Sequence, residues 1–392
     1  MPLVRPPSLR TSQTRSASQL ELFFDLAYVL AVAELASLLM ARAGWGGAGR
    51  FAALFAVVFL SWVSFTLYAN RFDTDDIIFR LAKFAGMGAI LGCAASMSAA
   101  TESKATVFAA SYLAGRLVLV GLYWRAWRHV TDARTTIGVY LITMSAVAAL
   151  WAVSLTVPTG VALWLWGAAA ALDVAAPFVA SRRHDRAPLH LEHLPERFGL
   201  LVILVLGEVI AAIVTGVHDA AWAPESVLLA GAAFVTAAAT WWVYFDVSGA
   251  VSSRALQRAQ EESKADEEND NEDVDERHDL FVFGHLPLTA GIVAAGAGVE
   301  DLVMHPSTPL PSAGSWLLVG GLATFTTGAA LIQGGSQRRP AQALLWPAGA
   351  GLVLLLVGWV GPASALPFTA TVALVLTAAA AVGTFLARTT NT

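Results

Sequence analysis

The sequence has little charge. Of its 392 residues, 14% are charged and 56% are hydrophobic, whereas ordinary soluble domains have about 25% charged and about 45–50% apolar residues. A soluble fold this apolar would lack the polar side chains needed to cover its surface, so the excess must face lipid. The composition therefore excludes a soluble enzyme. A net charge of -5 also gives no basic signature for nucleic acid.

Cysteine and the common catalytic motifs are also scarce. Cys93 is the only cysteine and lies in an apolar stretch, so the chain has no internal disulfide framework and no cysteine-based metal site. The sequence lacks a Walker-type glycine loop, a GxSxG nucleophile motif and an HExxH zinc motif. We therefore expect no cofactor and no catalytic residues, and an enzyme is the less favoured interpretation.

Long apolar runs are the dominant feature of the sequence. A hydrocarbon core of roughly 30 Å is crossed by about 20 apolar residues in a helix, and helix is the default because a strand in lipid would leave backbone groups unpaired. The sequence thus predicts an all-α integral membrane protein with about 12 transmembrane helices. The predicted spans are 20–40, 51–68, 77–97, 106–127, 136–155, 160–180, 198–217, 227–245, 281–303, 316–332, 344–360 and 368–386.

Lysine and arginine alternate unevenly between the predicted loops. Most of the 24 basic residues lie in segments that an even number of predicted spans separates from the N-terminus. These segments are therefore on the same side of the membrane as the N-terminus. Only Arg42, Arg50 and Lys104 fall on the opposite side. Because basic loops remain in the cytoplasm, both termini are predicted to be cytoplasmic.

Polar segments divide the chain into two predicted membrane halves. Residues 1–18 contain arginines but no acid, and we expect a disordered cytoplasmic tail. The first six spans (19–180) and the last six (198–387) are joined by a cytoplasmic connector at 181–197. The second half is interrupted at 247–280 by an acidic segment, which is predicted to be a flexible cytoplasmic loop.

Short motifs recur in the two halves. ELF at 21–23 and ERF at 196–198 open the first and seventh spans, and WVSF at 62–65 and WVYF at 242–245 lie in the second and eighth. The pattern predicts two parallel six-helix repeats, an architecture found in transporters, with a site near the midplane. Matches this short also arise by chance, so the duplication is a hypothesis.

Ionisable residues inside the spans are the candidates for function. Each costs about 2.5–3.5 kcal/mol on insertion scales, so such residues are functional candidates by default. The candidates in the spans or near their ends are Glu21, Asp25, Glu34, Arg80, Lys83, Arg116, Asp173, Glu208, His285 and Glu300.

Some of these charges can neutralise one another. Arg80 and Lys83 lie one helical turn apart near the cytoplasmic end of the third span, well placed to pair with Asp25. Arg116 is a further cation within a predicted span, and Asp173 a further acid within one. One interpretation is that such pairs only fix helix packing.

The other interpretation gives the carboxylates a role in transport. Glu34 and Glu208 occupy corresponding places in the proposed repeats, and neither has an obvious basic partner at its depth. We therefore expect them to gain and lose a proton, which suits proton coupling or cation passage.

Weaker patterns lie elsewhere in the chain. Asp73, Asp75 and Asp76 form either a solvated turn or a magnesium-binding cluster. His190 and His193 have a metal-like spacing, though no metal site is expected. GxxxG at 88–92 is typical of close helix packing.

The motifs together resemble one family. ELFFDL at 21–26, ERFG at 196–199, LGE at 206–208, WWVYFD at 241–246 and HLPL at 285–288 look like the bacterial low temperature requirement protein A family. The resemblance covers nearly the whole chain. It implies a multi-pass protein of the bacterial cytoplasmic (inner) membrane, named for a growth phenotype in the cold. The motif residues that the resemblance adds to the candidates are Glu196, Arg197, Asp246 and Pro287.

The favoured function is therefore a transporter- or channel-like one. The partners would be the lipid bilayer and a small solute or ion, handled by intramembrane carboxylates, with no role for nucleic acid. A membrane-embedded enzyme or lipid-handling protein is one alternative, which the acidic cluster at 73–76 would serve. A non-transporting membrane sensor in cold adaptation is the other.

Overall fold

The computed structural model describes residues 4–9, 18–42, 44–73, 75–180, 194–249, 271–334 and 340–389. Within these ranges the chain forms twelve α-helices and one two-stranded sheet. Eleven of the described helices are long and apolar enough to cross a membrane. In the twelfth helix, the apolar stretch among the described residues is Leu345–Val360, which is shorter than in the other eleven. The predicted all-α membrane architecture is confirmed.

The chain forms two compact units. The first contains Met1–Leu38 and Gly49–Arg197, and the second contains Leu39–Ala48 and Phe198–Thr392. The elements up to residue 180 are β1 (Ser8–Leu9), α1 (Gln19–Ala41), α2 (Trp45–Arg71), β2 (Phe72–Asp73), α3 (Ile77–Ser96), the 3-10 turn η1 (Met97–Ala99), α4 (Ala105–His129), α5 (Arg134–Ser154) and α6 (Thr159–Ala180). Those after it are α7 (Leu194–Asp219), α8 (Pro224–Trp242), the π-helical turn η2 (Val243–Gly249), α10 (Asn271–Met304), α11 (Ala313–Gly334), α12 (Pro340–Val360) and α13 (Ala365–Thr389).

Helix α2 is the core of the first unit. Its most apolar window is 83% buried, against 28–56% for the other spans up to α6. The enclosed surface is polar as well as apolar, because Ser61 and Asn70 are buried on it. Tyrosines of the surrounding helices bond to it: the hydroxyls of Tyr28 and Ser61 are 3.0 Å apart, and Tyr112 donates to the Val57 carbonyl at 3.2 Å. The polar contacts of this unit therefore converge on α2.

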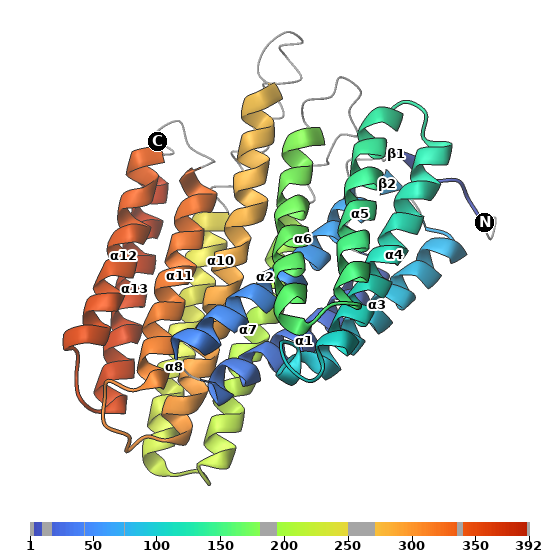
Figure 1. Ribbon diagram of the computed structural model, residues 1–392. Helices are drawn as coiled ribbons and strands as arrows, with labels where there is room; N and C mark the ends of the chain where they lie inside the picture. The colour runs from blue at the N-terminus through green and yellow to red at the C-terminus, as the bar shows by residue number, and fades with distance from the viewer. Residues whose placement is uncertain are drawn as a thin grey trace. The chain divides into compact units, whose positions relative to one another are not determined.

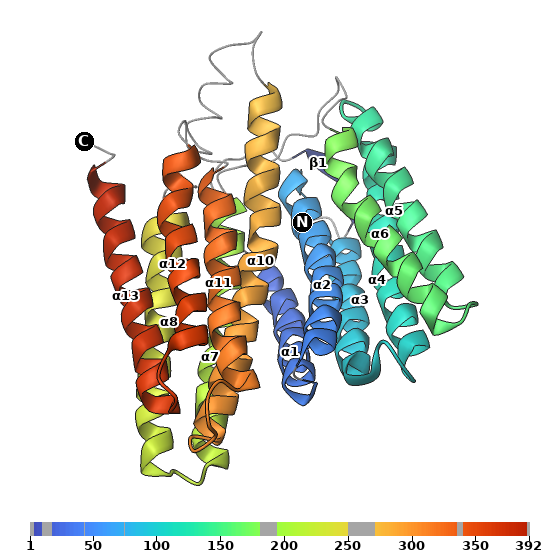
Figure 2. The ribbon, with the colours of Figure 1, turned by 60° about the vertical axis from the view of Figure 1, so that its left-hand side comes forward.

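Helices α10 and α11 of the second unit pack backbone against backbone. They lie side by side in Figures 1 and 2. A Cβ at Gly291 would lie 2.4 Å from the Phe325 nitrogen, and one at Gly321 would lie 2.5 Å from the Ala295 nitrogen. Glycines separated by seven residues share one face of a helix, which gives two matching rows. We call this interface the glycine seam; its glycines are Gly284, Gly291 and Gly298 on α10 and Gly314, Gly321 and Gly328 on α11.

The N-terminal tail contributes a short strand to the first unit, where the sequence predicts disorder over residues 1–18. Ser8 and Leu9 pair antiparallel with Asp73 and Phe72, which joins β1 to β2 (Figure 1). Arg5 donates to the Asp73 carboxylate at 2.9 Å. The prediction missed this strand because its partner lies far along the chain, where composition gives no signal.

The polar connections are described in part. The acidic segment predicted as a loop over 247–280 includes the last residues of η2 at its start and the first residues of α10 at its end, where the backbone is helical from Asn271. Residues 250–270 lie outside the described residues. The same holds for 181–193 of the predicted connector, and with them His190 and His193.

Asp76 anchors the N-terminal segment and the start of α3. Its carboxylate accepts from the Phe79 backbone nitrogen at 3.0 Å, from Arg125 at 2.5 and 3.1 Å, and from the Arg5 backbone nitrogen at 3.0 Å. Burial by itself raises the pKa of Asp76, but these donors outweigh it and hold the pKa below its ordinary value of 3.8. The folded protein therefore binds this proton more weakly than the unfolded chain does.

Asp76→Asn should lower the stability of the protein at neutral pH by about 1.5–3 kcal/mol, as expected for lost charge-assisted hydrogen bonds. Because the pKa is depressed on folding, this stabilisation is complete above pH 3.8 and is lost as the pH falls below it. Thermal unfolding in detergent should show the gap between wild type and variant closing as the pH is lowered. A gap that stays constant would contradict this assignment.

Candidate functional site

A reciprocal cap sets the start of α1. The Ser18 backbone nitrogen donates to Glu21 Oε2 at 2.8 Å, and the Glu21 backbone nitrogen donates to Ser18 Oγ at 3.2 Å. This is a capping box, in which the side chains of the first and fourth residues satisfy each other's free N–H groups. It fixes Glu21 in the first turn and places Asp25 one turn deeper.

Asp25 is the centre of a buried polar contact in the first unit. It has no exposed surface, and its Oδ1 accepts from Trp62 Nε1 at 2.9 Å and from Arg197 Nη2 at 3.0 Å. Trp62 comes from α2 and Arg197 from the first turn of α7. The remaining atoms of the ion pair, Asp25 Oδ2 and Arg197 Nη1, are buried and have no hydrogen-bond partner among the described residues.

Lys83 of α3 is a buried cation among aromatic rings. It is 1% exposed, and its Nζ lies 4.0 Å from the ring centre of Phe24, 5.4 Å from that of Phe65 and 5.7 Å from that of Phe79. Ring faces attract an ammonium group but accept no conventional hydrogen bond from it. Within the described ranges, no hydrogen bond or ion pair reaches this ammonium group.

These side chains form one electrostatic group. The charges of Glu21, Asp25 and Arg197 all act on Lys83. We call Glu21, Asp25, Trp62, Lys83 and Arg197 the polar cluster. It combines four ionisable groups inside the first unit, and its ion pair is only partly satisfied.

Arg80 does not join this cluster, contrary to the expectation that it could pair with Asp25. Its Nε binds Asp75 Oδ1 at 3.0 Å, and its side chain is 53% exposed. Arg80 lies in the first turn of α3, from which a long side chain can reach the polar boundary. The expected ion pair between Lys83 and Asp25 is also absent among the described contacts.

Arg116 and Asp173 form a second buried ion pair in the first unit. Arg116 of α4 contacts both carboxylate oxygens of Asp173 on α6, and the two side chains are 1% and 4% exposed. Arg116 also donates to the hydroxyls of Tyr112 and Ser64. This pair meets the requirements of the packing interpretation, because it links helices and uses both oxygens of the acid.

The other predicted carboxylates of the membrane segments are less enclosed. Glu34, Glu196 and Asp246 are exposed in their respective units. Glu208 on α7 and Glu300 on α10 are half-buried, and the charge of Glu208 acts on Glu300. The structure therefore does not bring Glu34 into the polar cluster.

His285 is fully buried in the second unit. Its Nδ1 lies 2.6 Å from the Phe281 carbonyl, to which it must donate, and its Nε2 lies 2.9 Å from the Tyr244 hydroxyl. The ring of Phe198 lies 4.5 Å away. The HLPL motif thus builds a histidine with both ring nitrogens hydrogen-bonded, close to Pro287, which lies inside α10.

The acidic cluster at 73–76 binds arginines. Asp73 pairs with Arg5 and Asp75 with Arg80, and Asp76 pairs with Arg125. Among the described residues, no group of three or more His, Cys, Asp or Glu is placed to hold a metal ion. The alternative of a lipid-handling site gains no support from these carboxylates.

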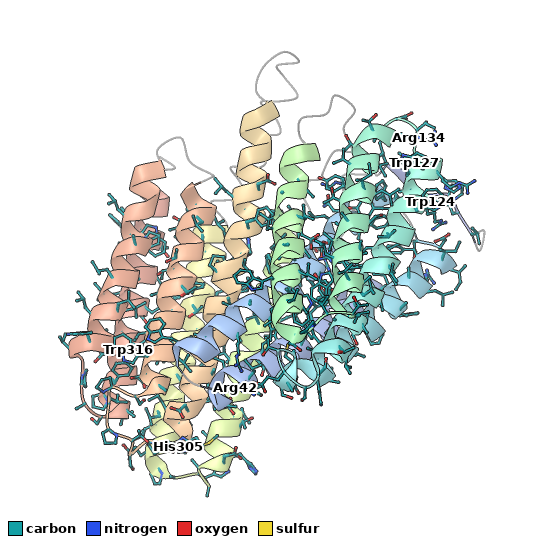
Figure 3. The ribbon with its side chains drawn as sticks, viewed as in Figure 1. Arg42, Trp124, Trp127, Arg134, His305 and Trp316 are labelled. Atoms are coloured by element: carbon teal, nitrogen blue, oxygen red, sulfur yellow. The ribbon has the colours of Figure 1, made fainter. Side chains whose placement is uncertain are left out.

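Aromatic and basic side chains gather where α4 ends and α5 begins. The rings of Trp124 and Trp127 stack 5.5 Å apart, and the Arg134 guanidinium lies 4.2 Å from the Trp127 ring (Figure 3). Trp124 is half-exposed. Tryptophan and arginine in this arrangement are typical of the membrane–water boundary.

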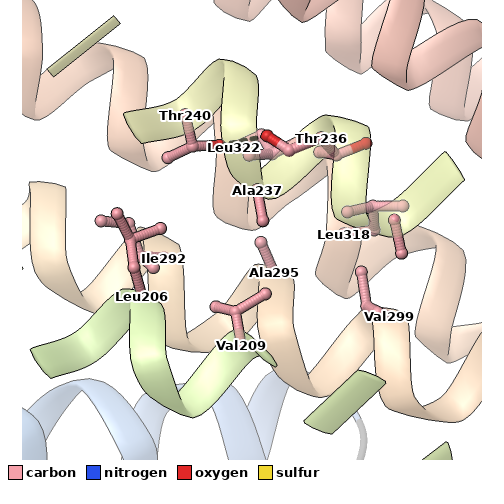
Figure 4. Close-up of a pocket in the computed structure, with 11 residues that line it drawn as sticks. Leu206, Val209, Thr236, Ala237, Thr240, Ile292, Ala295, Val299, Leu318 and Leu322 are labelled. Atoms are coloured by element: carbon pink, nitrogen blue, oxygen red, sulfur yellow. Dashed lines mark hydrogen bonds between the residues drawn. The ribbon is translucent and has the colours of Figure 1, made fainter. Parts of the chain in front are cut away.

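A small cavity in the second unit is apolar. Helices α7, α8, α10 and α11 line it, with side chains such as Val209, Ala237 and Val299 (Figure 4). Its two hydroxyls are already used, because Thr236 donates to the Ala232 carbonyl and Thr240 to the Thr236 carbonyl. The cavity therefore presents no polar group that could fix a ligand.

Trp62 is the residue of the polar cluster that sequence reasoning missed as a site residue. It appeared there only in the repeated WVSF motif, although its indole N–H holds Asp25. A tryptophan in the middle of a predicted span, away from the boundary where tryptophans gather, was the available signal.

Comparison with known sequences covers both units. The family model of the bacterial low temperature requirement A protein (LtrA) matches residues 16–384. A protein of Rhizobium meliloti (strain 1021), which carries the name of an uncharacterized protein, is 26% identical over 313 residues. These residues are 76% of this chain and 71% of that protein. The match to the family model includes every residue of the polar cluster.

Proposed function

We propose that this chain, which belongs to the bacterial low temperature requirement A family, is a transporter- or channel-like protein of the inner membrane that moves a small solute or ion through the polar cluster. The chain is a multi-span helical membrane protein. Charges kept inside such a protein are costly, and they mark pathways for ions and solutes.

The incomplete ion pair between Asp25 and Arg197 is the observation that carries the proposal. Arg116 uses both oxygens of Asp173, so in that pair the carboxylate is fully engaged and only Arg116 Nε is buried without a partner among the described residues. Arg197 uses one oxygen of Asp25, and the outer atoms of both groups are left without partners among the described residues. Unsatisfied buried polar atoms cost stability, so their retention supports a role in binding.

This proposal moves the polar centre away from Glu34. A carboxylate that is exposed on its own unit has no enclosed surroundings in which to select a solute. Asp25, one helical turn beyond Glu21 on α1, has both enclosure and charged neighbours. Glu208 stays a candidate for proton exchange within the second unit.

We further propose that both termini are cytoplasmic. In the first unit, Arg5 and Arg125 meet at the end of the helices that carries β1 and β2. At the opposite end of α2, Arg50 pairs with Glu102, which lies in the connection between α3 and α4. More arginines lie at the end of the first unit that carries β1 and β2. Because basic residues are retained on the cytoplasmic side, this end is assigned to the cytoplasm.

Flux into liposomes tests the proposed function. Purified protein is reconstituted with a pH-sensitive dye and offered a panel of small ions; Asp25→Asn should lower the flux about tenfold or more, as the loss of a charge-assisted contact implies. Arg80→Gln is the matched control, because it removes an exposed charge from the same unit. Wild-type flux in Asp25→Asn, or no flux of any ion, would overturn the proposal.

A further inference from the structure

Two arginines where α4 ends and α5 begins are exposed and have no counter-ion among the described residues. Arg128 lies in the last turn of α4, and Arg134 is the first residue of α5. The acid in the turn between them, Asp132, accepts from the Thr131 hydroxyl at 3.1 Å and forms an ion pair with neither arginine in the described contacts. Two positive charges and one negative charge leave this turn with an excess of at least one positive charge.

Neighbouring arginines at the same end of the first unit are already paired. Arg5, Arg80 and Arg125 each bind one carboxylate of the acidic cluster at 73–76. Arg125 shows the contrast most clearly, because it lies one turn before Arg128 on the same helix, yet its Nη2 reaches Asp76 Oδ2 at 2.5 Å. The charges of these three arginines are balanced within the protein, unlike those of Arg128 and Arg134.

A pair of tryptophans holds the unpaired charge in place. The Arg134 guanidinium lies 4.2 Å from the ring centre of Trp127, which stacks on Trp124 (Figure 3). Trp127 also lies close to α5, since a Cβ at Gly138 would lie 3.6 Å from its Nε1. A ring face attracts a guanidinium but accepts no conventional hydrogen bond, so the N–H groups of Arg134 stay available. We call Trp124, Trp127, Arg128 and Arg134 the junction site.

An exposed apolar face of α4 leads to the junction site. Positions 117, 121, 124 and 128 are three or four residues apart, so they share one face of the helix. Their residues are Leu117, Gly121, Trp124 and Arg128, and all four are exposed. A Cβ at Gly121 would have nothing within 4 Å, so the described chain leaves this part of the face open. The face therefore passes from apolar surface inside the span, through a tryptophan, to a cation at the end of the helix.

We infer that the junction site binds the headgroup of an anionic phospholipid, of the kind represented by phosphatidylglycerol. Arg128 and Arg134 donate to the phosphate oxygens, for which guanidinium donors are well matched, and an acyl chain lies along α4 over Gly121. The arginines are exposed, so the headgroup needs no enclosed cavity. A zwitterionic lipid brings its own cation and would leave the excess positive charge unbalanced. The inference is independent of the polar cluster and of the transported solute.

Two lipids with the same acyl chains test the choice of headgroup. Native mass spectrometry of the purified full-length protein in detergent counts bound lipids and gives the affinity for the first one. Phosphatidylglycerol should bind about fivefold or more tightly than phosphatidylcholine, as expected for one additional charge near a basic residue. Equal binding of the two lipids, or binding of neither, overturns the inference.

Variants of equal net charge then locate the site. Arg128→Gln and Arg134→Gln should each weaken phosphatidylglycerol about fivefold and leave phosphatidylcholine unchanged. Arg80→Gln is the matched control, because it removes the same charge from the same end of the unit but from a residue that is already paired. Weakening by Arg80→Gln equal to that of the other two variants shows that the lipid responds only to net charge, and overturns the site.

Trp127→Leu tests the positioning of Arg134. The variant keeps both arginines but removes the ring that holds one of them, so phosphatidylglycerol should bind more weakly than to wild type. In a double-mutant cycle, Trp127→Leu should add little to Arg134→Gln, because both changes remove the same contact. Thermal unfolding confirms that each variant is folded. Full additivity in folded proteins contradicts the role of Trp127 as a positioning residue for this site.

Discussion

Alanine at Gly321 should strongly destabilise the second unit, whereas alanine at the neighbouring Gly320 should not. A Cβ at Gly321 would lie 2.5 Å from the Ala295 nitrogen and 2.7 Å from the Gly291 oxygen, which are backbone atoms of the facing helix. Relief requires α10 and α11 to move apart, at a cost of about 3 kcal/mol, the upper end for overpacking. At Gly320 nothing lies within 4 Å, and alanine gains up to about 1 kcal/mol in helix propensity.

Unfolding in mixed detergent micelles measures this contrast directly. The two variants add the same methyl group to adjacent positions of α11, so a difference in composition cannot explain opposite effects. Gly298→Ala provides a second test in the glycine seam, since its Cβ would lie 2.4 Å from the Leu318 nitrogen. Equal stability of the Gly320 and Gly321 variants would show that the seam is not packed this tightly.

Removal of one member of the Arg116–Asp173 pair should be the most damaging single change in the first unit. Asp173→Leu leaves a buried guanidinium without its counter-ion, which typically costs about 3–5 kcal/mol. The double variant Arg116→Met with Asp173→Leu should recover much of this loss, because a buried ion pair is often replaceable by apolar side chains. Arg50→Gln should cost no more than about 1 kcal/mol, because its pair with Glu102 is exposed.

A double-mutant cycle on unfolding separates the pair's contribution from that of its neighbours. Flux adds an independent readout. If the pair only holds α4 against α6, a stable double variant should also retain flux. A stable double variant that has lost flux would give Arg116 and Asp173 a place in the solute pathway.

Composition alone was sufficient to predict the fold class. Membrane helices must satisfy their backbone internally, so apolar length translates almost directly into spans. The sequence also indicated the cost of buried charges such as Asp25, Lys83 and Arg116, because that cost belongs to the residue type. Which charges meet could not be predicted, since it depends on helix rotation and neighbours.

Arg80 and Lys83 show this limit. They lie one turn apart, yet Lys83 turns into a ring of phenylalanines while Arg80 reaches Asp75 near the boundary. The depth of a residue's backbone in a span can be estimated from the sequence. A long side chain, however, can carry its charged group out to the boundary, so backbone depth does not fix where the charge lies.

The glycines show a second limit. GxxxG at 88–92 predicted close packing, but Gly88 has nothing within 4 Å, and only Gly92 faces a neighbour, with Ser111 Oγ 2.5 Å from its added Cβ. Among the described glycines, the closest approaches to the backbone of another helix lie instead along the seven-residue spacing of the glycine seam. That spacing was readable in the sequence, but only the partner helix shows that both rows face each other.

The enclosure of α2 has a consequence for how the protein is made. α2 leaves the ribosome before α4, so the Val57 carbonyl and Ser64 Oγ, which accept from Tyr112 and Arg116 of α4, must first be accommodated without those donors. A mean hydropathy of 2.0 lets the helix enter the bilayer alone. Its polar groups can then form hydrogen bonds with helices that insert later. A chain that stops after α2 would leave these groups in lipid and present membrane quality control with an unfinished protein.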